Sequence, residues 1–248
     1  MYLVGDIGNT EIKICLFSDK EKLLKKVRLS TQNLSQKYLN KNLKFLENKN
    51  YNFDKVVFCS VVPSAFKIIK KFIENSKKIK CFELKKLSLK KLVNIKVDKK
   101  QIGSDRLANA ISVIDKKNNF IIVDFGTATN FDVVISKNYV GGILAPGVQL
   151  SLKSLSEKAS LIPKIHLKKA KKVIGKNTVS ALRSGFYHGY SGLIDNIIKL
   201  IIKQTRKQFK IILTGGYSYL FKNSIKGKVL VNKDLTIYGV LKVVKTLK

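Results

Sequence analysis

Four residues near the start of the chain combine a carboxylate, a glycine, a hydroxyl and an ammonium group at a spacing that suits phosphate chemistry. They are Asp6, Gly8, Thr10 and Lys13. In a hairpin, Gly8 lets a phosphate approach backbone N–H groups, and the Thr10 hydroxyl faces outward beside them. Asp6 can hold Mg²⁺ through water, and Lys13 supplies a point charge for phosphate. A simple Asp-Gly hairpin explains the same residues without chemistry, so both interpretations stay open at this point.

A second segment repeats this pattern about half a chain later. There an apolar run ends in Asp124, Gly126, Thr127 and Thr129, and a second apolar run follows. One such turn is common, but two matching turns at domain spacing favour a duplicated phosphate-binding unit. A third glycine turn, Thr214-Gly215-Gly216, would let an adenine or ribose come close to the backbone.

The segment Gly103-Ser104-Asp105-Arg106 stands directly before an apolar helical pattern. A carboxylate at a helix start can accept a proton from a substrate hydroxyl. The neighbouring guanidinium can bind a substrate carboxylate or stabilise phosphoryl charge. Capping of the helix by Ser104 or Asp105 is an equally good explanation from the residues alone.

The elements that must position these residues alternate between strands and helices, which predicts an α/β fold. Two copies of a strand, an Asp-x-Gly turn and a second strand predict two duplicated α/β domains, with a boundary in the polar linker 116–119. We therefore expect domains at 1–117 and 118–248. The further expected elements are strands at 56–62 and 211–216 and helices from Ser64, at 107–114, at 193–202 and at 235–244.

The formal net charge of +33 raises the question of nucleic-acid or membrane-surface binding. Nearly all of the positive charge is lysine, which is scattered along the chain, and arginine occurs only at 28, 106, 183 and 206. Readers of nucleic acids usually use arginine, whose planar fork binds phosphate and guanine at two points. The composition therefore favours biased codon usage, and we expect no specific nucleic-acid partner.

The cysteines and the apolar segments bear on where the protein works. Cys15, Cys59 and Cys81 are widely spaced and odd in number, which predicts reduced thiols in a cytoplasmic protein and no metal site. The N-terminus leads straight into a strand-like run, so we expect no signal peptide. No apolar stretch reaches the roughly 18 residues that a membrane span needs, so we expect no membrane association.

The ordered motifs together are similar to a known family. Two Asp-x-Gly turns followed by a glycine turn resemble the actin–hexokinase–Hsp70 superfold, in which ribonuclease H-like domains bind ATP in the cleft between them. The complete series resembles type III pantothenate kinases along almost the whole chain. The motifs that carry this resemblance are Asp6 to Lys13, Gly103 to Arg106, Asp124 to Thr129, Gly141-Gly142-Ile143-Leu144-Ala145-Pro146-Gly147, Gly175-Lys176-Asn177-Thr178, Thr214 to Gly216 and Asp234 to Gly239.

This resemblance implies phosphorylation of pantothenate by ATP to 4′-phosphopantothenate, the first step of coenzyme A biosynthesis. Asp105 would be the general base, and Asp124 would bind the monovalent cation, K⁺ or NH₄⁺, that the family requires. Mg²⁺ would lie near Asp6, and the enzyme would be a homodimer. The implied ATP-binding residues are Asp6, Ile7, Gly8, Asn9, Thr10, Glu11, Ile12, Lys13 and Thr127. The implied pantothenate-binding residues are Gly103, Ser104, Asp105, Arg106 and Thr178.

Two departures from the family pattern leave alternatives open. The family's Tyr-x-Asn-Pro before the Gly-x-Asp-Arg motif is replaced by Lys96-Val97-Asp98-Lys99, and a second Thr after Thr-Ala-Thr is replaced by Asn130. One alternative that these departures leave open is an actin-fold kinase for another small hydroxy acid or sugar. A third alternative is a regulatory relative without catalysis, against which the presence of Asp6, Asp105, Arg106 and Asp124 argues.

Overall fold

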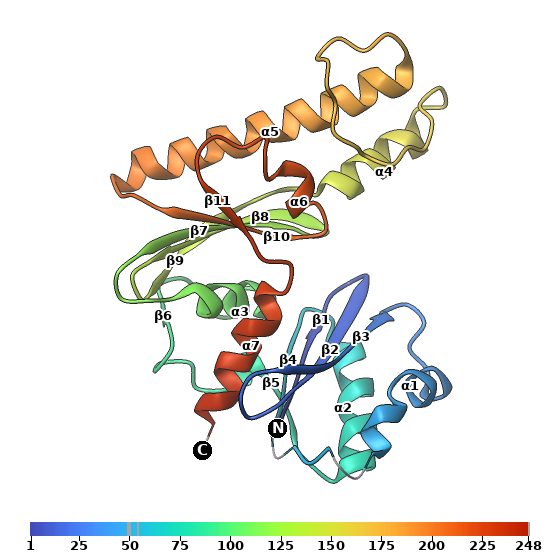
Figure 1. Cartoon of the computed structure of the whole chain (residues 1–248), viewed down its shortest axis with the longest axis vertical. Coiled ribbons are helices and arrows are strands. Elements are labelled where there is room, and N and C mark those ends of the chain that lie inside the picture. Colours follow the sequence, from blue (N-terminus) through green and yellow to red (C-terminus); the bar gives the residue numbers. More distant parts are fainter. Residues whose placement is uncertain (49–50, 54, 248) are drawn as a thin grey trace. The chain divides into compact units, whose positions relative to one another are not determined.

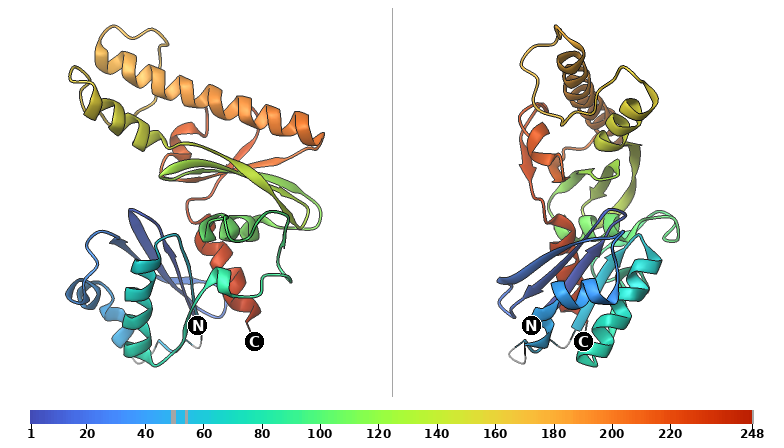
Figure 2. Two further views of the ribbon diagram at one scale, coloured as in Figure 1. Left: turned by 180° about the vertical axis from the view of Figure 1, so that it is seen from behind. Right: turned by 90° about the vertical axis from the view of Figure 1, so that its right-hand side faces the viewer.

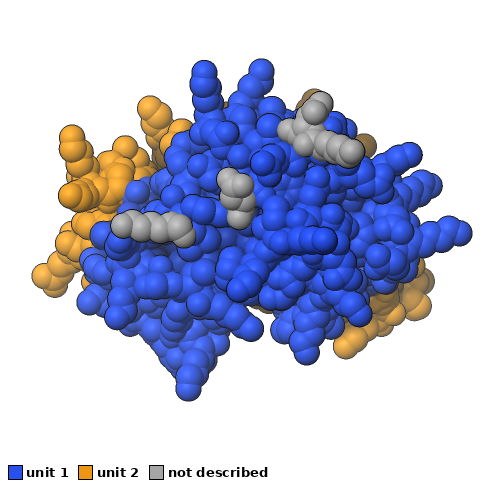
Figure 3. Space-filling model, turned by 90° about the horizontal axis from the view of Figure 1, so that it is seen from below, with its two compact units in different colours: residues 1–114, 137–139, 235–248 blue, residues 115–136, 140–234 orange. Residues whose placement is uncertain are grey.

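The computed structural model describes residues 1–48, 51–53 and 55–247, and the chain forms two compact units. Unit 1 comprises residues 1–114, 137–139 and 235–248, and unit 2 comprises residues 115–136 and 140–234. Figure 1 traces the elements and Figure 3 colours the two units. The last helix of the chain therefore belongs with the N-terminal residues.

Unit 1 is built on a five-stranded sheet with the order β3-β2-β1-β4-β5. Strands β1, β2 and β3 form an antiparallel meander, while β4 and β5 run parallel to β1. The strands are β1 (Tyr2–Ile7), β2 (Glu11–Phe17), β3 (Leu23–Ser30), β4 (Lys55–Ser60) and β5 (Cys81–Glu83).

Helices and short connections complete unit 1. The two-residue strand β6 (Asn94–Ile95) pairs in parallel with Asn138 and Tyr139, the first residues of β9. The helical elements are α1 (Gln36–Asn42), η1 (Lys44–Glu47), α2 (Pro63–Lys77), η2 (Leu84–Lys86), α3 (Ser104–Val113) and α7 (Leu235–Thr246).

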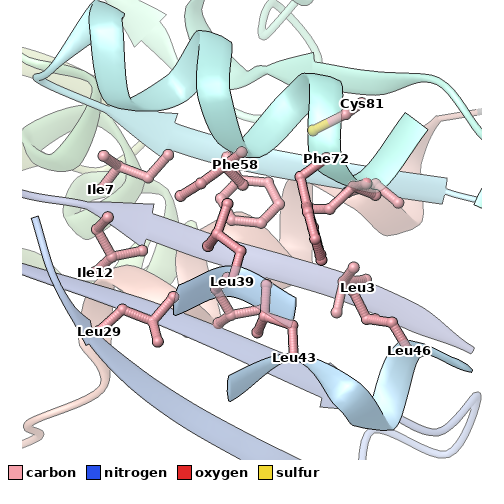
Figure 4. Packing of buried hydrophobic residues seen from close by; sticks show 14 of the residues in the cluster. Leu3, Ile7, Ile12, Leu29, Leu39, Leu43, Leu46, Phe58, Phe72 and Cys81 are labelled. Carbon is pink, nitrogen blue, oxygen red and sulfur yellow. The ribbon is translucent and has the colours of Figure 1, made fainter. Parts of the chain in front are cut away.

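One face of the unit 1 sheet is covered by α1, η1 and α2. The alternating residues of β1 and β2 that point to this face are apolar, as a half-buried strand requires. Figure 4 shows Leu3, Ile7 and Ile12 packed against Leu39 and Phe72 from the helices. This cluster is fully buried and holds the meander in register.

The opposite face of the sheet is covered by α3 and α7. Both views in Figure 2 place these two helices side by side, and they contact each other and β4. A side chain at Gly239 of α7 would overlap the backbone of Ala108 in α3, so glycine permits the close crossing. Thr236 Oγ1 also donates a buried hydrogen bond to Asn109 Oδ1 at 2.8 Å. The C-terminal helix thus supports α3.

Unit 2 repeats the sheet arrangement of unit 1. Its strands follow the order β11-β10-β7-β8-β9, with β7 and β8 antiparallel and β10 parallel to β7. The strands are β7 (Asn119–Phe125), β8 (Ala128–Ile135), β9 (Asn138–Pro146, of which residues 138 and 139 belong to unit 1), β10 (Lys210–Gly215) and β11 (Val229–Val231).

A 28-residue helix, α5 (Thr178–Thr205), runs across one face of this sheet (Figure 1). Its Tyr187 ring stacks on Phe221 at 5.8 Å, and Phe221 stacks on Phe125 of β7 at 5.1 Å. These buried rings join the helix to the sheet. The other helices of unit 2 are α4 (Val148–Lys158) and α6 (Ser218–Phe221).

The structure confirms the α/β class and the repeated strand–turn–strand motif. The expected helix at 193–202 is wrong in its extent, because α5 begins fifteen residues earlier, at Thr178, and ends at Thr205. Gly185, Gly189 and Gly192 lower the helix propensity of its first half, and packing overrides that preference. Within residues 1–48, 51–53 and 55–247, no helix is long and apolar enough to cross a bilayer.

Candidate active site

The first Asp-x-Gly turn, in unit 1, connects β1 to β2 and is held by hydrogen bonds from a residue outside the hairpin. Its own backbone closes through Gly8 N–H donating to Glu11 O at 3.0 Å. Thr31, which follows β3, donates from Oγ1 to Gly8 O at 2.7 Å and from its backbone N–H to Thr10 O at 3.1 Å. Asn9 and Thr10 remain exposed. The turn therefore presents its tip to solvent from a rigid base, as a phosphate site needs.

A row of polar side chains crosses the sheet next to this turn. Direct register pairs place Arg28, Lys13, Asp6 and Cys59 beside one another on β3, β2, β1 and β4. Directly opposed residues point to the same face of a sheet, which here is the face that carries α3 and α7. Two cations thus line up with the Asp6 carboxylate.

The first turn of α3 holds the sequence motif 103–106. The N-cap residue is Gly103, and within the described part of the chain no side chain caps this helix end. The alternative of capping by Ser104 or Asp105 is therefore wrong, because both lie inside the helix. The Asp105 carboxylate instead accepts the Arg106 N–H at 2.8 Å. The Ser104 hydroxyl donates to Glu83 Oε1 at 2.5 Å, away from the helix backbone.

The Asp105 carboxyl group is half-buried, and this environment changes its acidity. Burial raises the pKa of Asp105, while the Arg106 N–H and guanidinium and the Lys85 ammonium act in the opposite direction. A side chain at position 103 would overlap Asp105 Oδ1, so Gly103 provides room for the carboxylate. A carboxylate with a raised pKa beside a helix start is a suitable proton acceptor.

Cys59 shows that Asp6 and Asp105 belong to one cluster. The buried Cys59 Sγ donates a hydrogen bond to Asp6 Oδ1 at 3.3 Å. Burial raises the pKa of the Cys59 thiol well above its usual value, and the negative charges of Asp6 and Asp105 raise it further. Asp6 contacts this sulfur atom directly, while Asp105 lies on α3, which packs against β4, so unit 1 brings the two predicted residues to the same side of the sheet.

The second Asp-x-Gly turn, in unit 2, is supported by the Pro-Gly segment at the end of β9. Gly126 N–H donates to Ala128 O at 3.0 Å and closes the turn. The buried Thr129 hydroxyl donates to Pro146 O at 3.1 Å. Gly147 lies so close to the Thr127 carbonyl that no side chain fits there. This contact explains why a Pro-Gly pair accompanies the turn, and it leaves the Thr127 side chain exposed.

Asp124 lies at the end of β7 between two other parts of unit 2. Gly215 has a φ of +82° and packs against Asp124 Oδ1 and the Phe125 backbone, where a Cβ atom would overlap both. Asn130 is the direct cross-strand neighbour of Asp124. The buried Oδ1 of Asn130 accepts no hydrogen bond from any residue that the structure describes.

Thr178, the remaining predicted residue, lies in unit 2 as the first residue of α5. Asn177 caps this helix by accepting the Ser180 N–H at 2.9 Å, and Ser180 Oγ accepts the Asn177 N–H at 3.1 Å. Gly175 packs against the Ala181 backbone, which leaves no room for a side chain. The capping box fixes an exposed Thr178 side chain at the helix end.

Four residues near the site were not among the sequence-based candidates. They are Thr31, which follows β3, Cys59 in β4, Glu83 at the end of β5, and Lys85 in η2. Their contacts join segments that are distant in sequence. The Cys59-Ser60 pair at the end of a buried strand was the one local signal, since residues at such strand ends often line a site.

Comparison with known proteins agrees with this arrangement. Residues 2–200 match the family model for type III pantothenate kinase. The chain is 59% identical to a type III pantothenate kinase of Pelagibacter ubique (strain HTCC1062) over 248 residues, which covers 100% of both chains. It is 35% identical to a type III pantothenate kinase of Finegoldia magna over 255 residues, covering 99% of this chain and 97% of the relative.

A solved structure of low sequence identity shows the same fold. The inorganic polyphosphate/ATP-glucomannokinase of Arthrobacter sp. strain KM superposes with a TM-score of 0.51 at 13% identity. The superposition covers 98% of each chain. The two chains therefore share the fold of two repeated α/β units.

Proposed function

Because the chain belongs to the type III pantothenate kinase family, we propose that it transfers the terminal phosphoryl group of ATP to pantothenate and forms 4′-phosphopantothenate. This reaction is the first step of coenzyme A biosynthesis. The observation that carries the proposal is the Asp6–Cys59–Asp105 cluster, which joins a phosphate turn to a carboxylate with a raised pKa. Phosphoryl transfer depends mainly on positioning and charge neutralisation. The cluster positions the base near the turn, and Lys13 beside Asp6 and Arg106 beside Asp105 supply the positive charge.

Asp105 is the general base in this proposal. Its carboxylate removes the proton from the primary hydroxyl of pantothenate as the oxygen attacks phosphorus. The raised pKa brings the carboxylate closer to the working pH, which favours proton transfer. Arg106, the next residue, binds the substrate carboxylate or the transferring phosphoryl group. Gly103, Ser104 and Thr178 complete the residues that contact pantothenate.

Residues 6–13 and Thr127 bind ATP in this proposal. The backbone of the first turn and the Lys13 ammonium contact phosphate oxygens, and the exposed Thr127 side chain is a further ATP contact. The half-buried Asp6 carboxylate would hold Mg²⁺ through water, because it lies at the base of the turn beside Lys13 and carboxylate oxygens are ligands that Mg²⁺ prefers. Mg²⁺, when bound, neutralises charge on the phosphates.

Asp124 fits the monovalent cation in this proposal. Potassium prefers oxygen ligands, and Asp124 faces the buried Asn130 Oδ1, an oxygen that accepts no hydrogen bond from the described residues. Asp124 and Asn130 would hold the cation through their side-chain oxygens. Asn130 thus supplies an oxygen donor at the position where the family pattern has threonine.

We also propose that the enzyme is a cytoplasmic homodimer. Large apolar side chains are exposed on unit 2, and Leu161, Ile174 and Val173 are 89%, 79% and 71% exposed. Leu144 and Leu150 add to this surface, and such exposure favours an interface with a second copy. The three cysteines are buried and free, which supports a reducing compartment.

The first experiment measures ADP release from ATP with Mg²⁺ and K⁺, with and without pantothenate. Strong stimulation by pantothenate, with 4′-phosphopantothenate identified by mass spectrometry, is the expected result. If ATP binds but pantothenate has no effect, the substrate assignment is wrong. A panel of small hydroxy acids and sugars that carry a primary hydroxyl then identifies the acceptor.

A further inference from the structure

Glu83, at the junction of β5 and η2, contacts the first residue of α3. Its Oε1 accepts the Ser104 hydroxyl at 2.5 Å, and its Oε2 accepts the Lys85 backbone N–H at 2.8 Å. Ser104 is only 1% exposed. Hydrogen bonds to an ionised acceptor are short and roughly twice as strong as neutral ones, so this contact fixes the start of the helix.

Lys85 contacts the loop directly before the same helix. Its Nζ donates to the carbonyl oxygens of Ile102 at 2.7 Å and Lys100 at 3.2 Å. Residues 96–102 contain no proline and no aromatic residue that would stiffen this loop. Within the loop, Asp98 accepts the Lys100 N–H at its Oδ1 at 2.8 Å and the Gln101 N–H at its carbonyl oxygen at 3.1 Å. The Lys85 ammonium and the buried Ile102 side chain join this loop to the rest of unit 1.

We propose that Glu83 and Lys85 are positioning residues for the reaction. We call this pair of residues the Glu83/Lys85 bracket. Lys85 binds the backbone before Gly103, and Glu83 binds Ser104 after it. Together they fix the position of the Asp105 carboxylate relative to the substrate hydroxyl. This proposal rests on the proposed function. Neither bracket residue belongs to the sequence motifs, and both act through the segment that carries the base.

The charge of Lys85 gives the bracket a second effect. The Lys85 ammonium lowers the pKa of Asp105, which opposes the effect of burial. Arg106 of α3 acts in the same direction, and Cys59 of β4 lies close enough to feel the Asp105 charge. On α7, the ammonium of Lys242 contacts carbonyl groups at the other end of α3. Lys85 is thus a positive charge from outside α3 that favours the ionised form of the base.

Steady-state kinetics of the full-length chain test the bracket. Lys85→Met and Glu83→Gln should lower kcat/KM for pantothenate by roughly ten- to hundred-fold, because small misplacements of a base are costly. The KM for ATP should stay unchanged. Lys85→Arg should recover most of the loss, since it restores both the charge and the donors. Lys86→Met is the matched control, because it removes an exposed neighbouring charge, and it should behave like the unmodified chain.

The pH dependence separates positioning from general damage. In Lys85→Met, the acid limb of kcat/KM should move to higher pH, because the loss of the ammonium raises the pKa of Asp105. The Lys86→Met control should show no such shift. A folded Lys85→Met variant with unchanged kcat/KM and an unchanged acid limb would overturn the proposal.

Two further results keep the bracket testable. If Glu83→Gln fails to fold by circular dichroism, Ser104→Ala removes the partner hydroxyl instead, and a normal kcat/KM in that variant overturns the Glu83 part. If the unmodified chain does not respond to pantothenate, the proposed function fails. The bracket is then tested by the Asp105 pKa measured by carbon-13 NMR, which should be higher in Lys85→Met and unchanged in Lys86→Met.

Discussion

The thiol of Cys59 donates a hydrogen bond to the carboxylate of Asp6, with 3.3 Å between Sγ and Oδ1. The two residues are register neighbours on the parallel strands β4 and β1. The same relationship occurs in unit 2, where Thr214 on β10 is the register neighbour of Asp124 on β7. In both units, therefore, the strand that runs parallel to the Asp strand places a side chain capable of hydrogen bonding next to the aspartate of the Asp-x-Gly turn.

Replacing Cys59 tests how this contact orients Asp6. Cys59→Val keeps the volume and removes the donor, so the KM for ATP should rise between about two- and tenfold, as expected for one net hydrogen bond. Cys59→Ser retains a donor and should stay close to the unmodified enzyme. The control is Cys15→Val, which changes a buried thiol of β2 outside the cluster. Equal KM values in Cys59→Val and Cys15→Val would contradict the orienting role.

Asp105→Asn should nearly abolish turnover and leave ATP binding largely intact, because the amide cannot accept the substrate proton. The same change should raise the melting temperature near neutral pH. Burial raises the pKa of Asp105 in the folded state, so ionised Asp105 lowers stability above its ordinary pKa. That cost disappears as the pH falls through the raised pKa, so the melting temperatures of the two proteins should converge in acid. Normal turnover in Asp105→Asn would remove Asp105 from the base role.

Exchange of K⁺ for Na⁺ should lower activity and thermal stability at equal ionic strength. A cation that binds only the folded state increases the free energy of unfolding. At concentrations above Kd, this increase grows with the logarithm of the cation concentration. Asp124→Asn should remove this difference between the two salts. The melting temperature gives a readout that is independent of turnover. Equal melting curves of the unmodified chain in both salts would contradict the assignment of Asp124 and Asn130.

Gly239→Ala should destabilise the protein by about 1–3 kcal/mol, because the added methyl overlaps the Ala108 backbone of α3. Activity should fall as well, since α3 carries Asp105. The matched control is Gly189→Ala on the exposed side of α5, where the structure places no atom of the described residues within 4 Å of the added methyl. That change should be neutral or stabilise by up to about 1 kcal/mol. Urea unfolding measures both, and similar midpoints for the two variants would refute the close-crossing explanation.

The parts of the site that the sequence predicts are those built from local turns. Gly8 and Gly126 close their hairpins as expected, because a short Asp-x-Gly turn between two apolar runs has few other conformations. The helix near Leu107 was predicted, yet its cap at Gly103 was not, since space for the Asp105 carboxylate decides that residue. Thr31 and Glu83 were missed because their partners lie twenty or more residues away.

The position of α7 has a consequence for the order in which the two units can fold during synthesis. Residues 235–246 leave the ribosome after all of unit 2, yet they pack on α3 and on strands β1 and β4. The residues of unit 2 can therefore fold while the sheet of unit 1 still lacks its second cover. A chain that terminates early would expose the apolar face of that sheet and leave the Asp105 helix without support. Completion of synthesis thus becomes a condition for activity, and incomplete chains are marked for proteolysis by their exposed surface.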